Sequence, residues 1–414
     1  MSANAPAQSP RALYMTLLAA FLGWMFDGLE MGIFPLAARP ALQDLMQVQQ
    51  DAIIGLWMAR ITALFLLGAA LGGFLFGWMG DRIGRMRALS YSVLTYSVFT
   101  GLCYFVTAPW QLGALRFIAA LGMGGEWALG VALVMECWPE NRRPHLAGAI
   151  GAAANLGFAV IAVVGSAKPI TRESWRWIML AGAAPAFLTF LIRLYVPESH
   201  RWQNAKRVSS LQIIREVFGQ GLLKSTLLGI AYASIALIGT WASIQWLPSW
   251  ADQLTHGMIP RAKANAQILS ALGAVVGAGL SPILMRNLGR RTSYFILCVA
   301  SLGVCALLFR TVTEYGPKFL TLCCLAGCFT ASFYGWLALY LPELFPTRVR
   351  ATGQGVCYNT GRILAAVAAV ETGSLLQHYQ GSYAQAGATM TLVYLAGMVL
   401  IWFAPETQGK SLPE

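Results

Sequence analysis

The chain has 414 residues, of which 57% are apolar and 11% are charged, and its formal net charge is +12. A soluble domain of this composition would lack the polar surface needed to cover itself, so the composition excludes an ordinary soluble protein and favours a membrane protein. The positive charge does not indicate nucleic-acid binding, because most arginines are expected in short loops between membrane spans.

Twelve apolar segments are long enough to cross a hydrocarbon core of about 30 Å, because a helix rises about 1.5 Å per residue. Lipid offers the backbone no hydrogen bonds, and no strand-like alternation competes with the helical pattern. We therefore predict an all-α polytopic membrane protein. In chain order, the predicted spans are 12-38, 53-79, 88-107, 111-138, 146-167, 175-196, 223-248, 265-286, 293-313, 318-342, 351-376 and 386-404.

The distribution of basic residues predicts the orientation of these spans. With the N-terminus in the cytoplasm, most of the 29 Lys and Arg lie on the cytoplasmic side, as the positive-inside rule requires. Both termini are therefore predicted to be cytoplasmic, and the first span is too long for a signal-peptide core. The lack of Asn-x-Ser/Thr sequons and the short outer loops favour a bacterial inner membrane. The eight cysteines show no metal or redox spacing and are interpreted as reduced packing residues.

Four landmarks of the first half recur in the same order in the second half, at a nearly constant spacing. They are Gly84-Arg85 and Gly289-Arg290, Glu136-x-x-Pro139 and Glu343-x-x-Pro346, Asn155-x-Gly157 and Asn359-x-Gly361, and Pro197-Glu198-Ser199 and Pro405-Glu406-Thr407. We infer two pseudo-symmetric six-helix bundles, residues 1-196 and 223-414, joined by a cytoplasmic linker at 197-222 that is either an interfacial helix or a plain tether. Parallel repeats of this kind place a substrate site near the membrane midplane.

Several motifs resemble those of one transporter family. GWMGDRIGRMR (77-87) resembles the signature loop of the major facilitator superfamily, and the resemblance covers nearly the whole chain. The segments RFIAALGMGGEW, VPESHRW, LPELFPTRVRATG and PETQGKSLPE resemble its sugar-porter-like branch. GMGGEW, together with FDG in the first span, is most similar to proton symporters of sialate and monocarboxylates. The resemblance implies the major facilitator fold, alternating access and a proton gradient as the driving force, with no cofactor.

Two positions depart from the pattern of these relatives. In the second copy of the signature loop, Arg286 stands where the first copy has Asp81, so an acidic contact is lost there. Glu30 stands where many relatives carry a second aspartate in the first span. The departure leaves the role of Glu30 open.

Ionisable residues inside the membrane cost about 2.5 to 3.5 kcal/mol each, so each needs a partner or a function. The set comprises Asp27, Glu30, Arg60, Arg116, Glu126 and Arg362. Residue counting places Asp27 and Arg116 at the same depth, and we predict that they meet. An arginine favours the charged form of a nearby carboxyl, so separating the two would let Asp27 load a proton. Relatives use such a pair for coupling; the alternative is a static ion pair.

Three further charges have less defined roles. Glu30 lies one turn from Asp27 and could share its proton, pair with Arg60 or face the outer vestibule. Arg60 lies near the outer surface and would act as a gate or attract substrate. Glu126 lies about 15 Å deeper than Arg116 by residue count and is interpreted as part of the inner gate.

Arg362 is the first candidate for binding an anionic substrate. It lies near the midplane, and its planar fork of donors suits a carboxylate. The alternative is a structural bond from Arg362 to neighbouring carbonyls. The other candidates for substrate contact are Gln245, Asn359, Trp24, Trp241, Trp246, Tyr334, Trp336 and Arg60.

The signature loop and the charges near the inner helix ends are candidates for gating. Gly80 and Gly84 would allow a tight turn, and Asp81 can cap a helix N-terminus. The resemblance implies a charge network that closes the inner side when the outer side is open. The gating candidates are Gly77, Gly80, Asp81, Arg82, Gly84, Arg85, Glu126, Glu136, Arg142, Glu198, Glu343, Arg348, Arg350 and Glu406.

Together these features predict a monomeric proton-coupled symporter that imports a small organic anion. The alternative is a sugar or polyol symporter in which Arg362 is structural and aromatic side chains stack on the sugar. A more remote alternative is a nutrient sensor that does not transport. The four histidines lack metal-ligand spacing and no nucleotide-binding motif occurs, so we predict no enzyme, no catalytic residue and no metal site.

Overall fold

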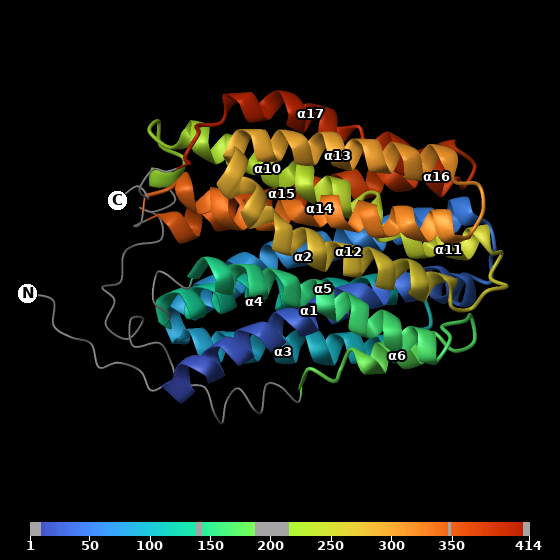
Figure 1. Cartoon of the computed structure of the whole chain (residues 1–414). Coiled ribbons are helices and arrows are strands. Elements are labelled where there is room, and N and C mark those ends of the chain that lie inside the picture. The colour runs from blue at the N-terminus through green and yellow to red at the C-terminus, as the bar shows by residue number, and fades with distance from the viewer. Residues whose placement is uncertain (1–9, 138–142, 187–214, 347–348, 409–414) are drawn as a thin grey trace, which may run out of the picture.

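The computed structural model describes residues 10–137, 143–186, 215–346 and 349–408, and these residues form helices and connecting loops without strands. The helices lie side by side along a common direction (Figure 1). The start of the first helix and the end of the last helical segment lie at the same end of the bundle, which we call the terminal end. The opposite end is called the far end. The all-α prediction is confirmed.

The helices fall into an N-terminal group and a C-terminal group. The N-terminal group is α1 (Pro10–Met46), α2 (Asp51–Ile83), α3 (Arg85–Leu102), η1 (Cys103–Phe105), α4 (Pro109–Cys137), α5 (Arg143–Ala167) and α6 (Arg176–Ala181). The C-terminal group is α10 (Leu223–Trp241), η3 (Ile244–Trp246), α11 (Leu247–Leu254), α12 (Ala262–Leu288), α13 (Arg290–Thr311), α14 (Pro317–Glu343), α15 (Arg350–His378), α16 (Tyr383–Met390), α17 (Val393–Leu400) and η4 (Ile401–Phe403).

The predicted spans coincide with these helices, although α1 and α11 continue beyond the ends predicted for their spans. Among the described residues, seven helical segments are long and apolar enough to cross a membrane by length and composition. The sixth predicted span is described only as far as residue 186, and the predicted linker only from residue 215. The boundary between the two bundles thus stays a prediction.

Equivalent helices of the two groups make equivalent contacts. In the N-terminal group α2 packs on α4 and α1 on α5; in the C-terminal group α12 packs on α14 and α10 on α15. The two groups meet where α2 packs against α15 and α5 against α12. The turns after α2 and α12 also correspond, because Gly84 (φ 109°) and Gly289 (φ 82°) both adopt a positive φ that favours glycine. Gly80, in contrast, lies within α2, so its predicted role in the turn is wrong.

Glycines bring the backbones of neighbouring helices into direct contact within each group. Gly72 in α2 lies against the carbonyl of Leu121 in α4, and Gly277 in α12 lies against the carbonyl of Cys328 in α14, leaving no room for a Cβ. Gly73 differs, because it faces the side chain of Asn359 across the contact between the two groups. Small residues are the usual means of close helix packing in membranes, where no hydrophobic effect draws helices together.

Candidate functional site

The best-buried ion pair in the described part of the N-terminal group joins α1 to α4. The Arg116 guanidinium forms a salt bridge with Oε1 of Glu30, and the two side chains are 2% and 0% exposed. Thr100 in α3 donates a hydrogen bond to the same oxygen over 2.9 Å. The guanidinium also lies 4.6 Å from the ring centre of Phe65, an arrangement that stabilises a cation away from water. The structure therefore pairs Arg116 with Glu30, whereas the sequence analysis predicted that Arg116 pairs with Asp27.

Arg116 also forms part of the wall of a cavity between the two groups. The cavity is lined by Met31, Phe34, Pro35, Met58, Thr62, Phe65, Arg116, Trp241, Gln245 and Trp246. Three of these residues, Trp241, Gln245 and Trp246, are substrate candidates from the sequence, and the structure brings them together with Arg116. Nε of Arg116 has no hydrogen-bond partner within the described part of the chain, so one strong donor is left beside the cavity.

The cavity is small in this conformation. Its volume of about 20 Å³ is room for about one water molecule. A carboxylate metabolite or a sugar needs a pocket of some hundreds of Å³. Entry of such a substrate therefore requires the two groups of helices to separate, as alternating access demands.

Arg362 lies outside the lining of this cavity. Its Nη1 donates to the backbone carbonyl of Ala69 in α2 and to Oδ1 of Asn359, each over 3.3 Å, and its guanidinium lies 4.9 Å from the ring centre of Tyr358. This geometry matches the structural alternative, a bond to a neighbouring carbonyl. Asn359 faces Gly73 and Arg362 and does not line the cavity either.

The remaining substrate candidates lie apart from the cavity lining. Trp336 is fully buried inside the C-terminal group, where it packs on Tyr232 and donates from Nε1 to the carbonyl of Arg290 over 2.9 Å. Arg60 is exposed and lies over the ring of Trp57. Trp24 and Tyr334 are half-buried. Trp336 thus has a packing role, and the gating role predicted for Arg60 stays a prediction.

Glu126 is buried in the interior, and its role at an inner gate stays a prediction. Its side chain is 1% exposed, and neither of its carboxyl oxygens has a hydrogen-bond partner in the described part of the chain. One of these oxygens lies against Gly23 of α1, one turn before Asp27, which is itself 5% exposed. Two acidic residues expected at different depths are thus both buried where α1 packs on α4, while Arg116 binds Glu30.

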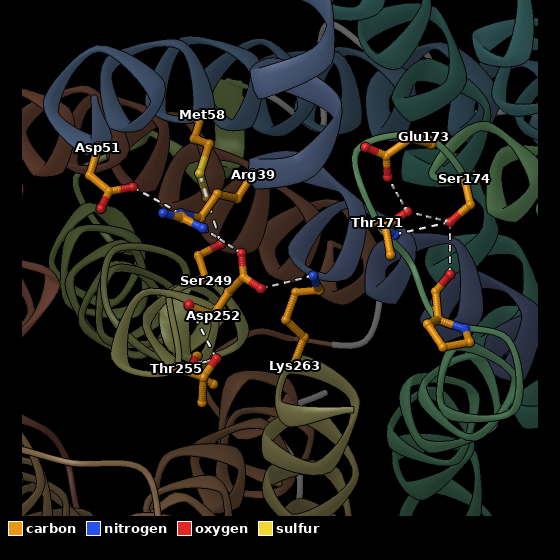
Figure 2. Close-up of polar contacts among 12 residues, drawn as sticks. Arg39, Asp51, Met58, Thr171, Glu173, Ser174, Ser249, Asp252, Thr255 and Lys263 are labelled. Carbon is orange, nitrogen blue, oxygen red and sulfur yellow. Dashed lines mark hydrogen bonds and ion pairs between the residues drawn. The ribbon is translucent and has the colours of Figure 1, made fainter. Parts of the chain in front are cut away.

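A second ionic network joins the two groups at the far end (Figure 2). Arg39, near the end of α1, donates from Nε to Asp51 of α2 over 2.8 Å and from Nη1 to Asp252 of α11 over 2.5 Å. Asp252 also accepts from Nζ of Lys263 in α12 over 3.0 Å. Gln253 donates to Asp51 over 2.9 Å and so adds a second bond between the groups. This far-end network holds the groups together on one side of the cavity.

The sequence analysis did not identify the far-end network. Its members lie just beyond the predicted spans and were expected in loops, where charges are usually solvated. In the structure α1 runs to Met46 and α11 to Leu254, so Arg39 and Asp252 are helical and buried. Helical periodicity continuing past the apolar stretches would have been the signal.

A third cluster ties the C-terminal group at the terminal end. Arg290 donates from Nη2 to Oε1 of Glu343 over 2.6 Å, and Glu406 accepts from the backbone N–H groups of Arg290 and Arg291 over 3.1 Å each. Glu343 and Glu406 were predicted as gating residues, and here both bind within their own group. Apart from Glu126, the other charged gating candidates lie outside the residues or side chains that the structure describes: Asp81, Arg82, Arg85, Glu136, Arg142, Glu198, Arg348 and Arg350.

Replacing Glu406 with glutamine should destabilise the protein at neutral pH and not in acid. Burial opposes its charge, but the backbone N–H groups of Arg291, Arg290 and Gln408 hold the pKa of Glu406 below its ordinary value of 4.5. A lowered folded-state pKa stabilises the fold above the unfolded value, and this contribution is lost as the pH falls through the folded-state pKa.

We expect a loss of about 1 kcal/mol at pH 7 in Glu406→Gln, as for other helix N-terminal acceptors. Thermal unfolding in detergent at a series of pH values measures it. Glu314→Gln, in an exposed loop, is the control and should match the wild type throughout. A deficit in Glu406→Gln that persists unchanged below pH 4 would contradict the assignment.

An all-helical bundle with apolar spans, buried ion pairs and a cavity between two equivalent groups defines a multi-pass membrane transporter. The chain belongs to the Major Facilitator Superfamily, which matches it over residues 15–370. It is therefore a transporter and not an enzyme, and its fold is the twelve-helix fold that the sequence predicted.

Relatives in bacteria match nearly the full chain. The inner membrane metabolite transport protein YgcS of Escherichia coli (strain K12) is 31% identical over 386 residues, covering 84% of this chain and 82% of its own. The cis,cis-muconate transport protein of Acinetobacter baylyi is 26% identical, covering 95% of each chain. Among solved structures, a D-xylose-proton symporter superposes with a TM-score of 0.75 at 17% identity, covering 97% of this chain and 100% of its own. That likeness concerns the fold alone.

Proposed function

We propose that the chain is a proton-coupled symporter that moves a small organic anion, with a carboxylate as its recognised group, into the cytoplasm. The observation that carries the proposal is the position of Arg116, which is bound to Glu30 on one side and keeps an unused donor beside the cavity on the other. A buried guanidinium with a free donor suits a carboxylate in geometry and charge.

The same arrangement supplies a coupling mechanism. When a substrate carboxylate binds Arg116, it competes with Glu30 for the guanidinium. Glu30 then lies in a dry site without its full counter-charge, and a buried carboxyl without a cation favours the protonated form. Anion binding and proton binding therefore support each other, which is the thermodynamic requirement for symport. In this mechanism Glu30 takes the coupling role that the sequence assigned first to Asp27.

Relatives support a carboxylate more than a neutral substrate. The Acinetobacter baylyi relative is named for cis,cis-muconate, a dicarboxylate, and its chain aligns with almost the whole of this one. One observation favours a sugar or polyol instead: Trp241 and Trp246 both line the cavity and offer aromatic faces on which a sugar ring can stack. Both readings keep the proton as driving ion and place the termini in the cytoplasm.

Reconstitution into liposomes tests the proposal. Wild-type protein and Glu30→Gln would be incorporated with a trapped pH dye, and sialic acid, cis,cis-muconate, short monocarboxylates, aromatic acids and hexoses would be added outside. We expect a carboxylate to acidify the lumen in the wild type and Glu30→Gln to reduce the signal to that of empty liposomes, which also control for permeation of the undissociated acid.

The matched control is Glu371→Gln, which removes an exposed glutamate from α15 and should leave proton entry unchanged. Acidification by hexoses alone would replace the carboxylate with a sugar. Acidification by a carboxylate that persists in Glu30→Gln would reject the coupling mechanism.

A further inference from the structure

Two buried hydroxyl groups lie directly behind one wall of the cavity. Met58 of α2 lines the cavity, and its sulfur accepts hydrogen bonds from Ser249 of α11 over 3.9 Å and from Tyr383 of α16 over 3.8 Å. The Ser249 side chain is fully buried, and Tyr383 is 3% exposed. Figure 2 shows the bond between Met58 and Ser249 beside the far-end network. Both hydroxyls therefore reach from the C-terminal group to one sulfur of the N-terminal group.

The sulfur is a poor partner for these hydroxyls. A thioether accepts hydrogen bonds only weakly, and both bonds are longer than those between oxygen atoms. In the part of the chain that the structure describes, neither hydroxyl donates to an oxygen or a nitrogen. Burying a hydroxyl without a good acceptor costs free energy. Ser249 and Tyr383 thus keep two donors that a stronger acceptor can bind.

A substrate in the cavity can reach both hydroxyls when Met58 moves. Methionine is unbranched and flexible, so its side chain changes conformation at little cost. The ring of Tyr383 also packs on that of Trp246, another residue of the cavity wall, with 6.0 Å between the ring centres. Arg116 lines the same cavity. One substrate can therefore contact Arg116 and the two hydroxyls together.

The donors define the chemical group that fits behind Met58. An uncharged carbonyl oxygen has two lone pairs, so it can accept from both hydroxyls at once. A second carboxylate would be buried without a counter-ion, because the cations drawn with Ser249 in Figure 2, Arg39 and Lys263, are already paired with aspartates. A substrate hydroxyl would bring a proton that needs a further acceptor. A carbonyl oxygen is the group that satisfies both donors and adds no charge.

We propose that Ser249 and Tyr383 form a second recognition point that binds an uncharged carbonyl oxygen of the substrate. The Met58 sulfur holds the two hydroxyls while the cavity is empty. The substrate class is then a carboxylate that carries a keto, ester or amide carbonyl away from its carboxyl group. The part of this inference that concerns the carboxylate at Arg116 rests on the proposed function, whereas binding of the carbonyl is measured without proton transport.

Calorimetric titration of the purified protein in detergent tests the carbonyl site. The probes are levulinate and its homologues with one or two further methylene groups, because the chain length that spans the cavity is not fixed in advance. Each keto acid is compared with the isostere in which a methylene group replaces the keto oxygen. We expect at least one keto acid to bind about tenfold more tightly than its isostere, since two hydrogen bonds are gained. Equal affinity within every pair, or no binding of any keto acid, would overturn the proposal.

Variants that lack one hydroxyl separate recognition from structure. Tyr383→Phe and Ser249→Ala should each lower the preference for the keto acid to about threefold, and the double variant should abolish it. Affinity for the isosteres should stay unchanged, whereas a purely structural role would weaken both members of a pair. The matched control is Tyr379→Phe, which removes a tyrosine hydroxyl bonded to Thr389 away from the cavity lining and should keep the preference.

Replacing Met58 with leucine gives a change in the opposite direction. Leucine has a similar volume but no acceptor, so both hydroxyls lose the partner that a substrate carbonyl has to displace. We expect the preference for the keto acid to rise about threefold above that of the wild type. A preference equal to or below the wild-type value would overturn the role of the sulfur.

The liposome assay distinguishes this site from the proposed function. If keto acids bind with the expected preference and no acid brings protons into wild-type liposomes, the proposed function fails and the carbonyl site stands. If carboxylates enter with protons and no keto acid is preferred to its isostere, the carbonyl site fails alone.

Discussion

Replacing Arg116 with methionine is expected to abolish transport and to destabilise the protein by about 3–5 kcal/mol, because it leaves the fully buried Glu30 without its cation. Among the residues that the structure describes, Thr100 is then the one donor left to Glu30, and one neutral hydrogen bond does not replace a salt bridge in a dry site. Thermal unfolding in detergent measures the stability, and the liposome assay measures transport.

A double variant separates the two effects. Glu30→Gln combined with Arg116→Met removes both charges, and replacing a buried ion pair with uncharged side chains is often neutral for stability. We therefore expect the double variant to regain most of the lost stability while transport stays absent. A single Arg116→Met variant with the melting temperature of the wild type would show that the pair is not the buried interaction described here.

Loosening the far-end network is expected to open that side of the cavity. In Asp252→Asn, Arg39 and Lys263 both lose their charged partner in α11, so the contact between the two groups weakens. A hydrogen bond to a charged group contributes about 1.5–3 kcal/mol, and about 1.4 kcal/mol is a tenfold change in an equilibrium. The population open at the far end should therefore rise by about tenfold or more.

A cysteine at Thr62, which lines the cavity, reports this opening. Its rate of modification by a membrane-impermeant thiol reagent should rise about tenfold in the Asp252→Asn background. The matched control is Asp44→Asn, which breaks the 2.5 Å ion pair between Asp44 and Arg176 inside the N-terminal group. That variant should leave the labelling rate unchanged. Equal rates in both backgrounds would mean that the far-end network does not control access.

The positions of the helices could be predicted because lipid offers no hydrogen bonds to the backbone, so a membrane span must satisfy its own N–H and C=O groups. A long apolar segment must be helical, and the repeat of Gly84 as Gly289 reveals two related groups. Each of these features is local in sequence. The two glycines both adopt a positive φ in the structure, as expected for corresponding turns of a repeat.

The partners of the buried charges could not be predicted from depth alone. Asp27 and Glu30 lie one turn apart on the same helix, so counting residues places both within reach of the long Arg116 side chain. Helix rotation decides between them, and it is set by packing that one sequence does not show.

The glycine contacts have a consequence for how substrate preference changes among relatives. Within each group, backbones touch directly, as at Gly72 and Gly277, so the skeleton of a group tolerates little substitution. The cavity wall is built from side chains such as Thr62, Gln245 and Trp241, which take no part in those contacts. Substitution of a few of these side chains can therefore change which substrate fits the cavity. The helix packing within each group stays the same, so the same fold can serve relatives with different substrates.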